Sequence, residues 1–411
     1  MIFHNHKYAV FLVVFFALFL RFWGIGFVTS YTIDEGMMVP SSERYVENGH
    51  SSPAPWMHPP LPFISIYATM RLLGDNPYGW RLRSALFGGL SVLMLFLLGR
   101  ELLPDVKMAY LAALLLAVEP IHILLSRSTN CEITSLFYFI TAVYITVRYL
   151  KGSIASPWLA GILLGMAIAE RWYYLPSLAA ILLFTVICKY RDGELTWTEI
   201  AHMGSIYIVL PVSIYLMTFL PWFQRGTSLS DFIQMQVDAY ARLQSITLKT
   251  FYNPIMQLSP SSPWDWFTTA VMYGSQSEQA GGWGRFSLYM NNYPVWILTI
   301  PAFMYTAYRS IKLKDRYLAL IVVLFVATYF QFILVKRPIF FYTSPVVLPL
   351  VYLLVAYAVV SSLKKVVHAE HYIAGIAAAT TAWALYLYPL VVSLSVPIVL
   401  YAPVLMFARL Y

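Results

Sequence analysis

Long apolar stretches recur along almost the whole of this 411-residue chain. A transmembrane helix needs about 20 predominantly apolar residues to cross the hydrocarbon core of a bilayer. Hydrophobic residues make up 60% of the chain and charged residues only 11%, whereas a soluble domain is about half apolar and a quarter charged. Because a backbone in lipid must satisfy its hydrogen bonds within the segment, these stretches predict an all-α polytopic membrane protein.

The apolar stretches predict about 11 to 13 transmembrane helices. We expect them at residues 8–29, 81–103, 107–126, 130–150, 156–172, 173–190, 200–222, 293–311, 316–336, 341–363, 370–388 and 389–408. The first stretch contains Arg21 and lacks a small-residue cleavage site, so it is interpreted as a retained helix rather than a signal peptide. The 156–190 region is either one hairpin or a re-entrant pair.

Lysine and arginine are distributed unevenly between the two sides that these helices define. Cytoplasmic loops carry an excess of both residues, so the lysine-rich side, with the N-terminus, is predicted to be cytoplasmic. The outer side keeps mainly arginines, whose planar guanidinium groups bind phosphate and carboxylate through paired hydrogen bonds. We therefore expect ligand-binding charge on the extracytoplasmic face of the cell membrane, although a single arginine at a helix end can also simply reach toward the headgroups.

The predicted helices divide the chain into three parts. An N-terminal transmembrane module at 1–222 includes a first outer loop at 30–80; a second extracytoplasmic loop follows at 223–292; C-terminal transmembrane helices occupy 293–411. Within the first outer loop, residues 60–73 are apolar but too short to span, which predicts a helix lying in the interface.

The first outer loop carries adjacent carboxylates, Asp34 and Glu35, directly after the first apolar stretch. Carboxylates at a membrane surface are costly to desolvate, so a cation or a hydroxyl should compensate them. One carboxylate could accept the proton of a hydroxyl while the other orients it, or either could hold a divalent metal. A solvated pair in a loop is the alternative. His58, followed by two prolines that fix a turn, either binds a ligand or orders the loop.

A second group of charged residues lies where the third and fourth predicted helices meet the outer surface. Glu119, Arg127 and Glu132 fall within 14 residues of one another, and charge so close to the apolar core indicates a candidate functional site. A structural salt bridge between Arg127 and Glu132 is the alternative.

Three arginines at outer helix ends, Arg81, Arg83 and Arg337, are candidates for binding the phosphate of a lipid that arrives from the outer leaflet. The sequence has no zinc-ligand spacing, phosphate-binding Walker loop, dinucleotide fingerprint or nucleophile elbow. Its formal charge of +8 is modest, and we expect no nucleic-acid partner.

Four motifs, in order along the chain, resemble the protein O-mannosyltransferases, membrane enzymes of the GT-C glycosyltransferase fold. They are Ile33-Asp34-Glu35; His58-Pro59-Pro60-Leu61; the stretch Arg81-Leu82-Arg83-Ser84-Ala85-Leu86-Phe87-Gly88; and Ser126-Arg127 followed by Glu132. Two weaker echoes are Ser262-Pro263-Trp264-Asp265-Trp266 and Arg337 with Phe340 and Tyr342. The sequence departs from the family at Pro62-Phe63 and Thr343-Ser344, and it lacks the sugar-binding-like domain that eukaryotic members insert in the late loop.

This resemblance implies an inverting transfer of a monosaccharide, most simply mannose, from a polyprenyl or dolichyl phosphate to a protein Ser or Thr hydroxyl. Asp34 would be the base, and Glu35 and Glu132 would shape the acceptor site. The substrate-binding set would be His58, Arg81, Arg83, Arg127, Arg337, Tyr342 and Trp264. No cofactor is expected, because the lipid-linked sugar is a substrate; dependence on a divalent metal is left open, as is the oligomeric state.

Two alternatives remain at this point. Aminoarabinose transferases that act on lipid A share much of the same frame, so a lipid or glycan acceptor is possible with the same donor chemistry. A lipid flippase or transporter would need a polar or broken-helix site near mid-membrane and usually repeat symmetry, whereas the polar clusters here gather on one side.

Overall fold

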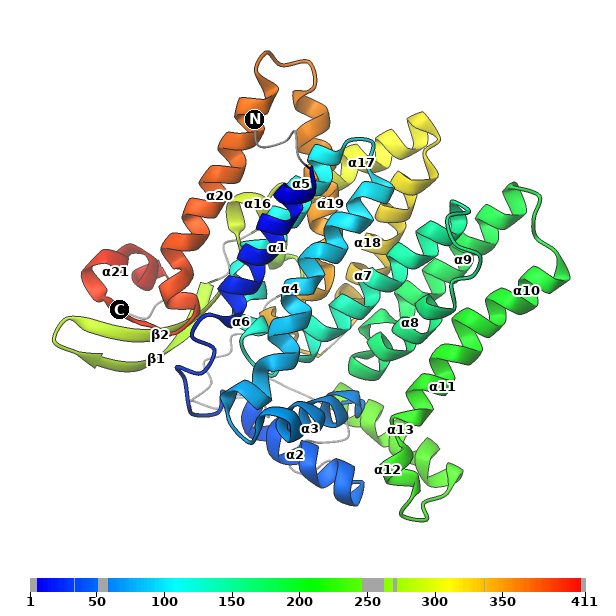
Figure 1. The fold of residues 1–411 in the computed structure, drawn as a ribbon, viewed down its shortest axis with the longest axis horizontal. Helices are drawn as coiled ribbons and strands as arrows, with labels where there is room; N and C mark the ends of the chain where they lie inside the picture. The colour runs from blue at the N-terminus through cyan, green and yellow to red at the C-terminus, as the bar shows by residue number, and fades with distance from the viewer. Residues whose placement is uncertain are drawn as a thin grey trace.

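The computed structural model describes residues 6–32, 34–50, 58–245, 262–268, 272–335 and 337–407, and it is predominantly helical (Figure 1). Within these residues, seven helical segments are long and apolar enough to cross a membrane, or eight if one bent pair is a single span. The seven are Pro77–Leu102 (α4), Cys131–Leu150 (α7), Trp172–Arg191 (η2 and α9), Trp197–Met217 (α10 to α11), Arg316–Leu334 (α18), Phe341–Leu363 (η4 and α19) and Ala369–Val391 (α20). The chain is therefore an integral, multi-pass membrane protein.

The remaining helices are shorter than the sequence suggested, so fewer segments reach spanning length than the 11 to 13 expected. Apolar helices of sub-spanning length include α1 (His6–Phe22), α3 (Leu61–Leu73) and α8 (Trp158–Glu170). Two other short helices are α16 (Tyr293–Trp296) and α17 (Thr299–Leu313). The first stretch, expected at 8–29, ends at Phe22 because Gly24 turns the chain with a positive φ of 66°.

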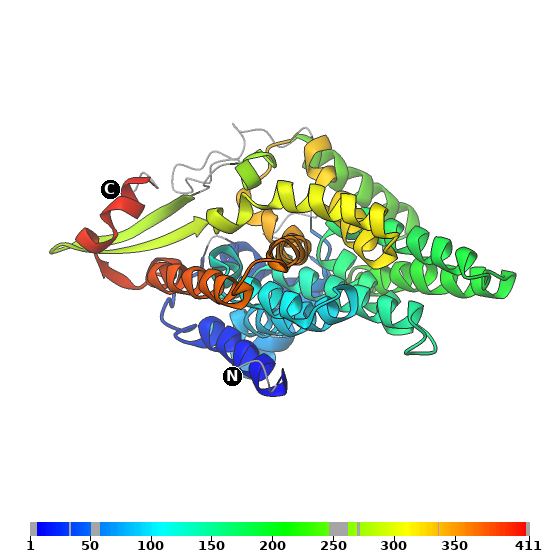
Figure 2. The ribbon, with the colours of Figure 1, turned by 90° about the horizontal axis from the view of Figure 1, so that it is seen from above.

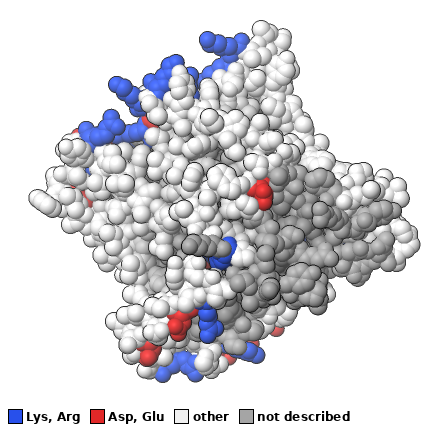
Figure 3. Space-filling model, turned by 180° about the vertical axis from the view of Figure 1, so that it is seen from behind, with Lys and Arg blue, Asp and Glu red and all other residues white. Residues whose placement is uncertain are grey.

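The most deeply buried helices are α4, α7 and α19, while α9, the α10–α11 segment and α20 leave most of their apolar surface uncovered. Figure 2 shows α19 near the middle of the bundle, with α20 and α10 toward its opposite ends. Lys and Arg gather along one end of the molecule in Figure 3, both signs of charge occur at the other end, and a broad, mostly uncharged belt lies between them, with an acidic and a basic side chain visible near its middle. Uncovered apolar side chains in this belt are suited to lipid.

The predicted helix at 107–126 is broken in the structure. It forms α5 (Val106–Ala117) and α6 (Pro120–Ser126), which are bent by 58°. Pro120 has no N–H to donate to the carbonyl of Leu116, as residue i+4 would in a continuous helix. The buried Arg21 guanidinium donates to that carbonyl at 3.2 Å and to the Ala117 carbonyl at 3.1 Å. Arg21 therefore supplies the hydrogen bonds that a break in an apolar environment requires.

The C-terminal region differs from the expected span at 389–408. Helix α20 continues to Val391, and the chain then turns at Ser393 into β3 (Ser395–Pro397) and a ten-residue helix, α21 (Ile398–Phe407). The interruption coincides with Ser393, whose positive φ of 58° does not fit a right-handed helix.

A three-stranded antiparallel sheet in the late outer loop was not predicted. It has the order β1 (Met272–Ala280), β2 (Trp283–Met290) and β3. Ala280 pairs with Trp283, and the two connecting residues, Gly281 and Gly282, have φ values of 57° and 80°. Two consecutive positive φ angles are what a tight hairpin turn requires, and glycine adopts them without strain.

The first outer loop forms two helices that lie across the end of the bundle (Figure 1). Helix α2 (Glu35–Asn48) begins at the adjacent carboxylates, and α3 matches the expected interfacial helix at 60–73. The two helices pack around Met38, Val39, Tyr45, Phe63 and Ile66, which form an apolar cluster separate from the main core. This packing places the start of α2 beside the ends of α4 and α7.

Candidate active site

Glu35 is fully buried in a paired ion contact with Arg81 at the start of α4. The Arg81 Nε and Nη2 atoms donate to the two Glu35 carboxylate oxygens at 2.7 and 2.8 Å. Glu35 also accepts the backbone N–H groups of Thr32 at 2.9 Å and Thr129 at 3.1 Å. Arg81 further donates to the carbonyls of Ile25 and Val28. The pair therefore joins four separate segments, and all of its strong hydrogen-bonding capacity is used within the protein.

Asp34 differs from its neighbour. It is half-buried at the N-cap of α2, its side chain makes no capping bond, and among the described residues its carboxylate has no hydrogen-bond partner. Burial, with the Glu132 and Glu35 carboxylates nearby, raises the pKa of Asp34 to about 6, against the opposing effect of Arg171. A carboxylate that is unpaired, partly accessible and more basic than usual is suited to accept a proton near neutral pH.

Glu132, in the first turn of α7, is fully buried and lies within 2.8 Å of the Arg171 Nη2 atom. Neither of its carboxylate oxygens accepts a hydrogen bond of good geometry from the described residues. Arg171, between α8 and η2, also contacts the His58 Nδ1 atom. Burial and the positive charges of Arg171 and Arg337 lower the pKa of His58 well below its usual value. His58 is therefore neutral and accepts from Arg171.

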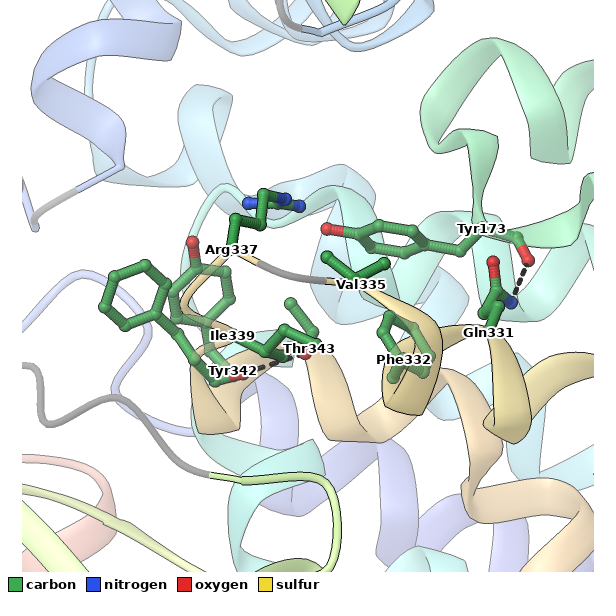
Figure 4. A pocket seen from close by; sticks show the side chains of 9 residues that line it. Tyr173, Gln331, Phe332, Val335, Arg337, Ile339, Tyr342 and Thr343 are labelled. Carbon is green, nitrogen blue, oxygen red and sulfur yellow. Dashed lines mark hydrogen bonds between the residues drawn. The ribbon is translucent and has the colours of Figure 1, made fainter. Parts of the chain in front are cut away.

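Arg337 reaches the same region from the segment that follows α18. It lines a pocket of about 40 Å³ together with Tyr173, Gln331, Phe332 and Tyr342. Figure 4 shows the Tyr173 hydroxyl directed toward the Arg337 guanidinium, with Tyr342 below them. The Tyr342 hydroxyl is also within electrostatic range of Asp34, Glu132 and Arg171. Tyr342 thus connects the pocket that holds Arg337 with the nearby group of Asp34, Glu132 and Arg171.

Three residues that were expected to bind substrate, Arg83, Arg127 and Trp264, lie outside this group of charged residues. Arg83 is buried against Glu170, with its Nη1 atom 2.6 Å from the Glu170 Oε1 atom. Arg127 does not pair with Glu132; it donates to the carbonyls of Leu20, Arg21 and Trp23 at the end of α1.

Trp264 is half-exposed, and its ring packs edge-on against Tyr329 at a centroid distance of 6.5 Å. Glu119, a further residue of interest, is buried at the α5–α6 break, where it accepts a hydrogen bond from Trp296 Nε1 at 3.1 Å. Within the described residues, these contacts of Trp264 and Glu119 do not reach Asp34, so the two residues lie apart from the carboxylate–arginine cluster.

No individual role in the site was predicted for Glu170, Arg171 or Tyr173. These residues lie where α8 ends and η2 begins, between two apolar stretches that were interpreted only as membrane segments. The adjacent charges of Glu170 and Arg171 inside a long apolar region were the available signal. Tyr289 of β2 is a further unpredicted neighbour, within electrostatic range of Asp34 and Glu35.

No group of three or more His, Cys, Asp or Glu side chains arranged to hold a metal ion occurs in the described part of the chain. Whether the reaction depends on a divalent metal, which the sequence left open, is a separate question.

Comparison with known proteins places this arrangement in a wider group. A family model described as dolichyl-phosphate-mannose-protein mannosyltransferase matches residues 57–218. Polyprenol-phosphate-mannose–protein mannosyltransferases of Corynebacterium glutamicum and Mycobacterium tuberculosis are 21% and 22% identical to this chain, covering 84% and 82% of it and 81% and 78% of their own length.

Solved structures share the fold at low sequence identity. The S. cerevisiae protein O-mannosyltransferase Pmt1–Pmt2 complex bound to the sugar donor has a TM-score of 0.76 at 12% identity, covering 96% of this chain and 91% of that chain. ArnT from Cupriavidus metallidurans bound to undecaprenyl phosphate has a TM-score of 0.53 at 15% identity, covering 93% and 70%.

The fold is that of the GT-C membrane glycosyltransferases, as the sequence predicted. The family match and the relatives confirm the more specific resemblance: this chain is a glycosyltransferase related to the protein O-mannosyltransferases.

Proposed function

We propose that this protein transfers mannose from a polyprenyl phosphate to a Ser or Thr hydroxyl of a protein, at the extracytoplasmic face of the cell membrane. The proposal rests on the unpaired Asp34 carboxylate, which lies in the same cluster as the Arg171 and Arg337 guanidinium groups. The donor and acceptor classes are those of the bacterial relatives' names. The lysine-rich loops assign the opposite end of the molecule to the cytoplasm.

Arg171 and Arg337 are assigned to the phosphate of the donor, in place of Arg81 and Arg83. Arg81 and Arg83 donate well-aligned hydrogen bonds to the buried Glu35 and Glu170 carboxylates, and moving either arginine to a phosphate would break them. The 2.8 Å contact between Arg171 and Glu132 has no such hydrogen bond among the described residues. Phosphate is a good leaving group once its charge is balanced, and preorganised guanidinium groups provide that balance without reorganisation during the reaction. Neutral His58 keeps the Arg171 guanidinium in place by accepting its hydrogen bond.

The transfer itself needs one base. Asp34 removes the proton of the acceptor hydroxyl, whose oxygen forms a bond to the anomeric carbon from the face opposite the phosphate. The bond from that carbon to the phosphate oxygen breaks, and its electron pair leaves with the phosphate held by the arginines. Glu132, whose carboxylate oxygens accept no well-aligned hydrogen bond from the described residues, is placed to orient a hydroxyl of the acceptor or of the sugar.

The proposal is tested by a transfer assay with the purified protein in lipid nanodiscs. Radiolabelled polyprenyl-phosphate mannose is offered with a Ser/Thr-rich peptide, with a lipid extract, and with the peptide in the presence of EDTA. We expect label on the peptide and a mass increase of one hexose, with and without EDTA. Label found only in the lipid fraction would replace the protein acceptor by a lipid or glycan acceptor, and loss of activity with EDTA that added metal restores would establish a metal requirement.

Arg337→Ala is expected to weaken donor binding about 10- to 100-fold, because a charge-assisted hydrogen bond to phosphate is lost. Binding is measured by titrating the unlabelled polyprenyl phosphate into the protein. Arg71→Ala, at the exposed end of α3, is the matched control and should leave donor affinity unchanged. Equal affinities for the Arg337 variant and the wild type would remove Arg337 from the phosphate site.

A further inference from the structure

Helix α13 (Leu229–Ser245), in the late outer loop, has one side fixed to the protein. Phe232 is buried on this side, and its ring lies 5.0 Å from that of Phe219 and 5.4 Å from that of Phe223. Ala239 is buried two turns further along the helix. The helix begins with a cap in which Ser228 and Asp231 exchange hydrogen bonds, so its start is well defined.

A second side of α13 is apolar and exposed. It consists of Leu229, Ile233, Val237 and Tyr240, each between 55% and 65% exposed. Their spacing of four, four and three residues places them in one stripe along the helix. Asp231, Gln234, Asp238 and Arg242 flank this stripe with polar and charged groups. An apolar stripe bordered by polar side chains is the pattern of a helix that lies in a membrane surface.

The stripe continues a surface that already faces lipid. The preceding span, Trp197–Met217, is among the least buried in the structure, and Val212 and Met217 on it are more than half exposed. Leu220, in the short α12 (Leu220–Phe223) that connects the span to α13, is also half exposed. In Figure 1, α13 lies at the foot of α11. The occupant that suits this continuous apolar surface is therefore the lipid of the adjoining leaflet.

The side of α13 that faces the protein is connected by hydrogen bonds to the segment that carries Arg171. The Tyr215 hydroxyl on α11 donates to the Gln236 Oε1 atom at 3.0 Å. The same hydroxyl accepts from the Trp172 Nε1 atom at 3.1 Å. Trp172 lies between Arg171, which contacts Glu132 and His58, and Tyr173, which lines the pocket below Arg337. Two hydrogen bonds thus connect the lipid-facing helix with the segment that carries Arg171.

We propose that α13 is a membrane-surface helix whose apolar stripe inserts among the lipids of the active-site leaflet. We further propose that Gln236 and Tyr215 are positioning residues, through which the position of α13 in the membrane determines the positions of Arg171 and Tyr173. The second part rests on the proposed function, because it concerns the site for the donor phosphate. The first part does not, since the seating of α13 can be measured without any transfer reaction.

The lipid contact is tested with environment-sensitive dyes on single cysteines. Val237→Cys, in the stripe, and Asp238→Cys, next to it on the polar side, are labelled in nanodiscs of phosphatidylcholine and phosphatidylglycerol. We expect blue-shifted emission and quenching by doxyl lipids for the dye at position 237, and quenching by aqueous iodide for the dye at position 238. Two dyes that are equally open to iodide would overturn the assignment, as would energy transfer between molecules at position 237 that indicates a second copy on the stripe.

The relay, meaning the two hydrogen bonds that connect Gln236, Tyr215 and Trp172, is tested by measuring the KM for the donor. Gln236→Leu removes the acceptor for Tyr215, and we expect the donor KM to rise about 3- to 10-fold with kcat nearly unchanged. Gln236→Glu keeps an acceptor oxygen and should restore the wild-type value. The control is Gln234→Leu, whose side chain, among the described residues, hydrogen-bonds Asp238 on the exposed side.

The Trp172→Phe variant should raise the donor KM similarly, and the double variant with Gln236→Leu should be no worse than the poorer single variant. Fully additive effects would show that the two residues act independently and would end the relay. If transfer itself is absent, the dye measurements still decide the membrane contact, so the two failures are distinguishable.

Discussion

Asp34→Asn is expected to lower mannosyl transfer about 100- to 10,000-fold while leaving the fold and donor binding intact. The side chain keeps its size but can no longer accept the proton of the acceptor hydroxyl. Because the Asp34 carboxylate makes no hydrogen bond to the described residues, the substitution leaves no buried partner unsatisfied. The measurement is kcat for peptide mannosylation together with titration of the polyprenyl phosphate. Glu43→Gln, on the exposed side of the same helix, is the matched control.

The pH dependence gives an independent measurement of the same base. The pKa of Asp34 is raised to about 6, so the carboxylate is ionised above that pH and protonated below it. Since only the ionised form accepts a proton, transfer by the wild type should fall as the pH decreases through about 6. The residual activity of Asp34→Asn should not show this step. Turnover close to that of the wild type in the Asn variant would assign the base to another residue.

Arg81→Met is expected to destabilise the folded protein by about 3–5 kcal/mol, because it leaves the buried Glu35 carboxylate without its cation. Combining it with Glu35→Gln should recover part of the loss, since the remaining side chain is neutral. The free energy of unfolding is measured by chemical denaturation in detergent micelles. Arg71→Met on exposed α3 serves as the control and should change stability little.

This second measurement also separates two roles for Arg81. A positioning role in the ion pair predicts lost stability in the variant. A role in the phosphate site, which the sequence suggested, predicts lost donor affinity with stability retained. Normal stability combined with weak donor binding would therefore return Arg81 to the phosphate site and refute the internal pairing as its main function.

Helices and motifs were predicted with different success, for physical reasons. Spans such as 130–150 and 316–336 were located within a few residues, because lipid demands a continuous helix wherever about 20 apolar residues occur. The break at Glu119-Pro120 was missed, since the pattern of hydrophobicity continues through it. A tertiary contact from Arg21 makes that break tolerable in an apolar environment.

In the late outer loop, a sheet was missed although the residues of its turn are adjacent in the sequence. Gly281 and Gly282 form the turn of a hairpin that was not predicted. Strand β1 is mostly polar, and the alternation of β2 becomes meaningful only once α20 and α21 provide a surface on which Phe286, Leu288 and Met290 pack.

The sequence alone determined that this is a helical membrane protein, that Asp34, His58 and Glu132 are candidate site residues, and that the chain resembles the protein O-mannosyltransferases. Only the tertiary structure decided which charges are available. Glu35 and Arg81, 46 residues apart, neutralise each other, while Asp34 lies unpaired beside Glu132, and Arg171 enters the site from an apolar stretch. The reason is that ionic partners in a weakly solvated site are chosen by packing across distant segments, which local sequence patterns do not encode.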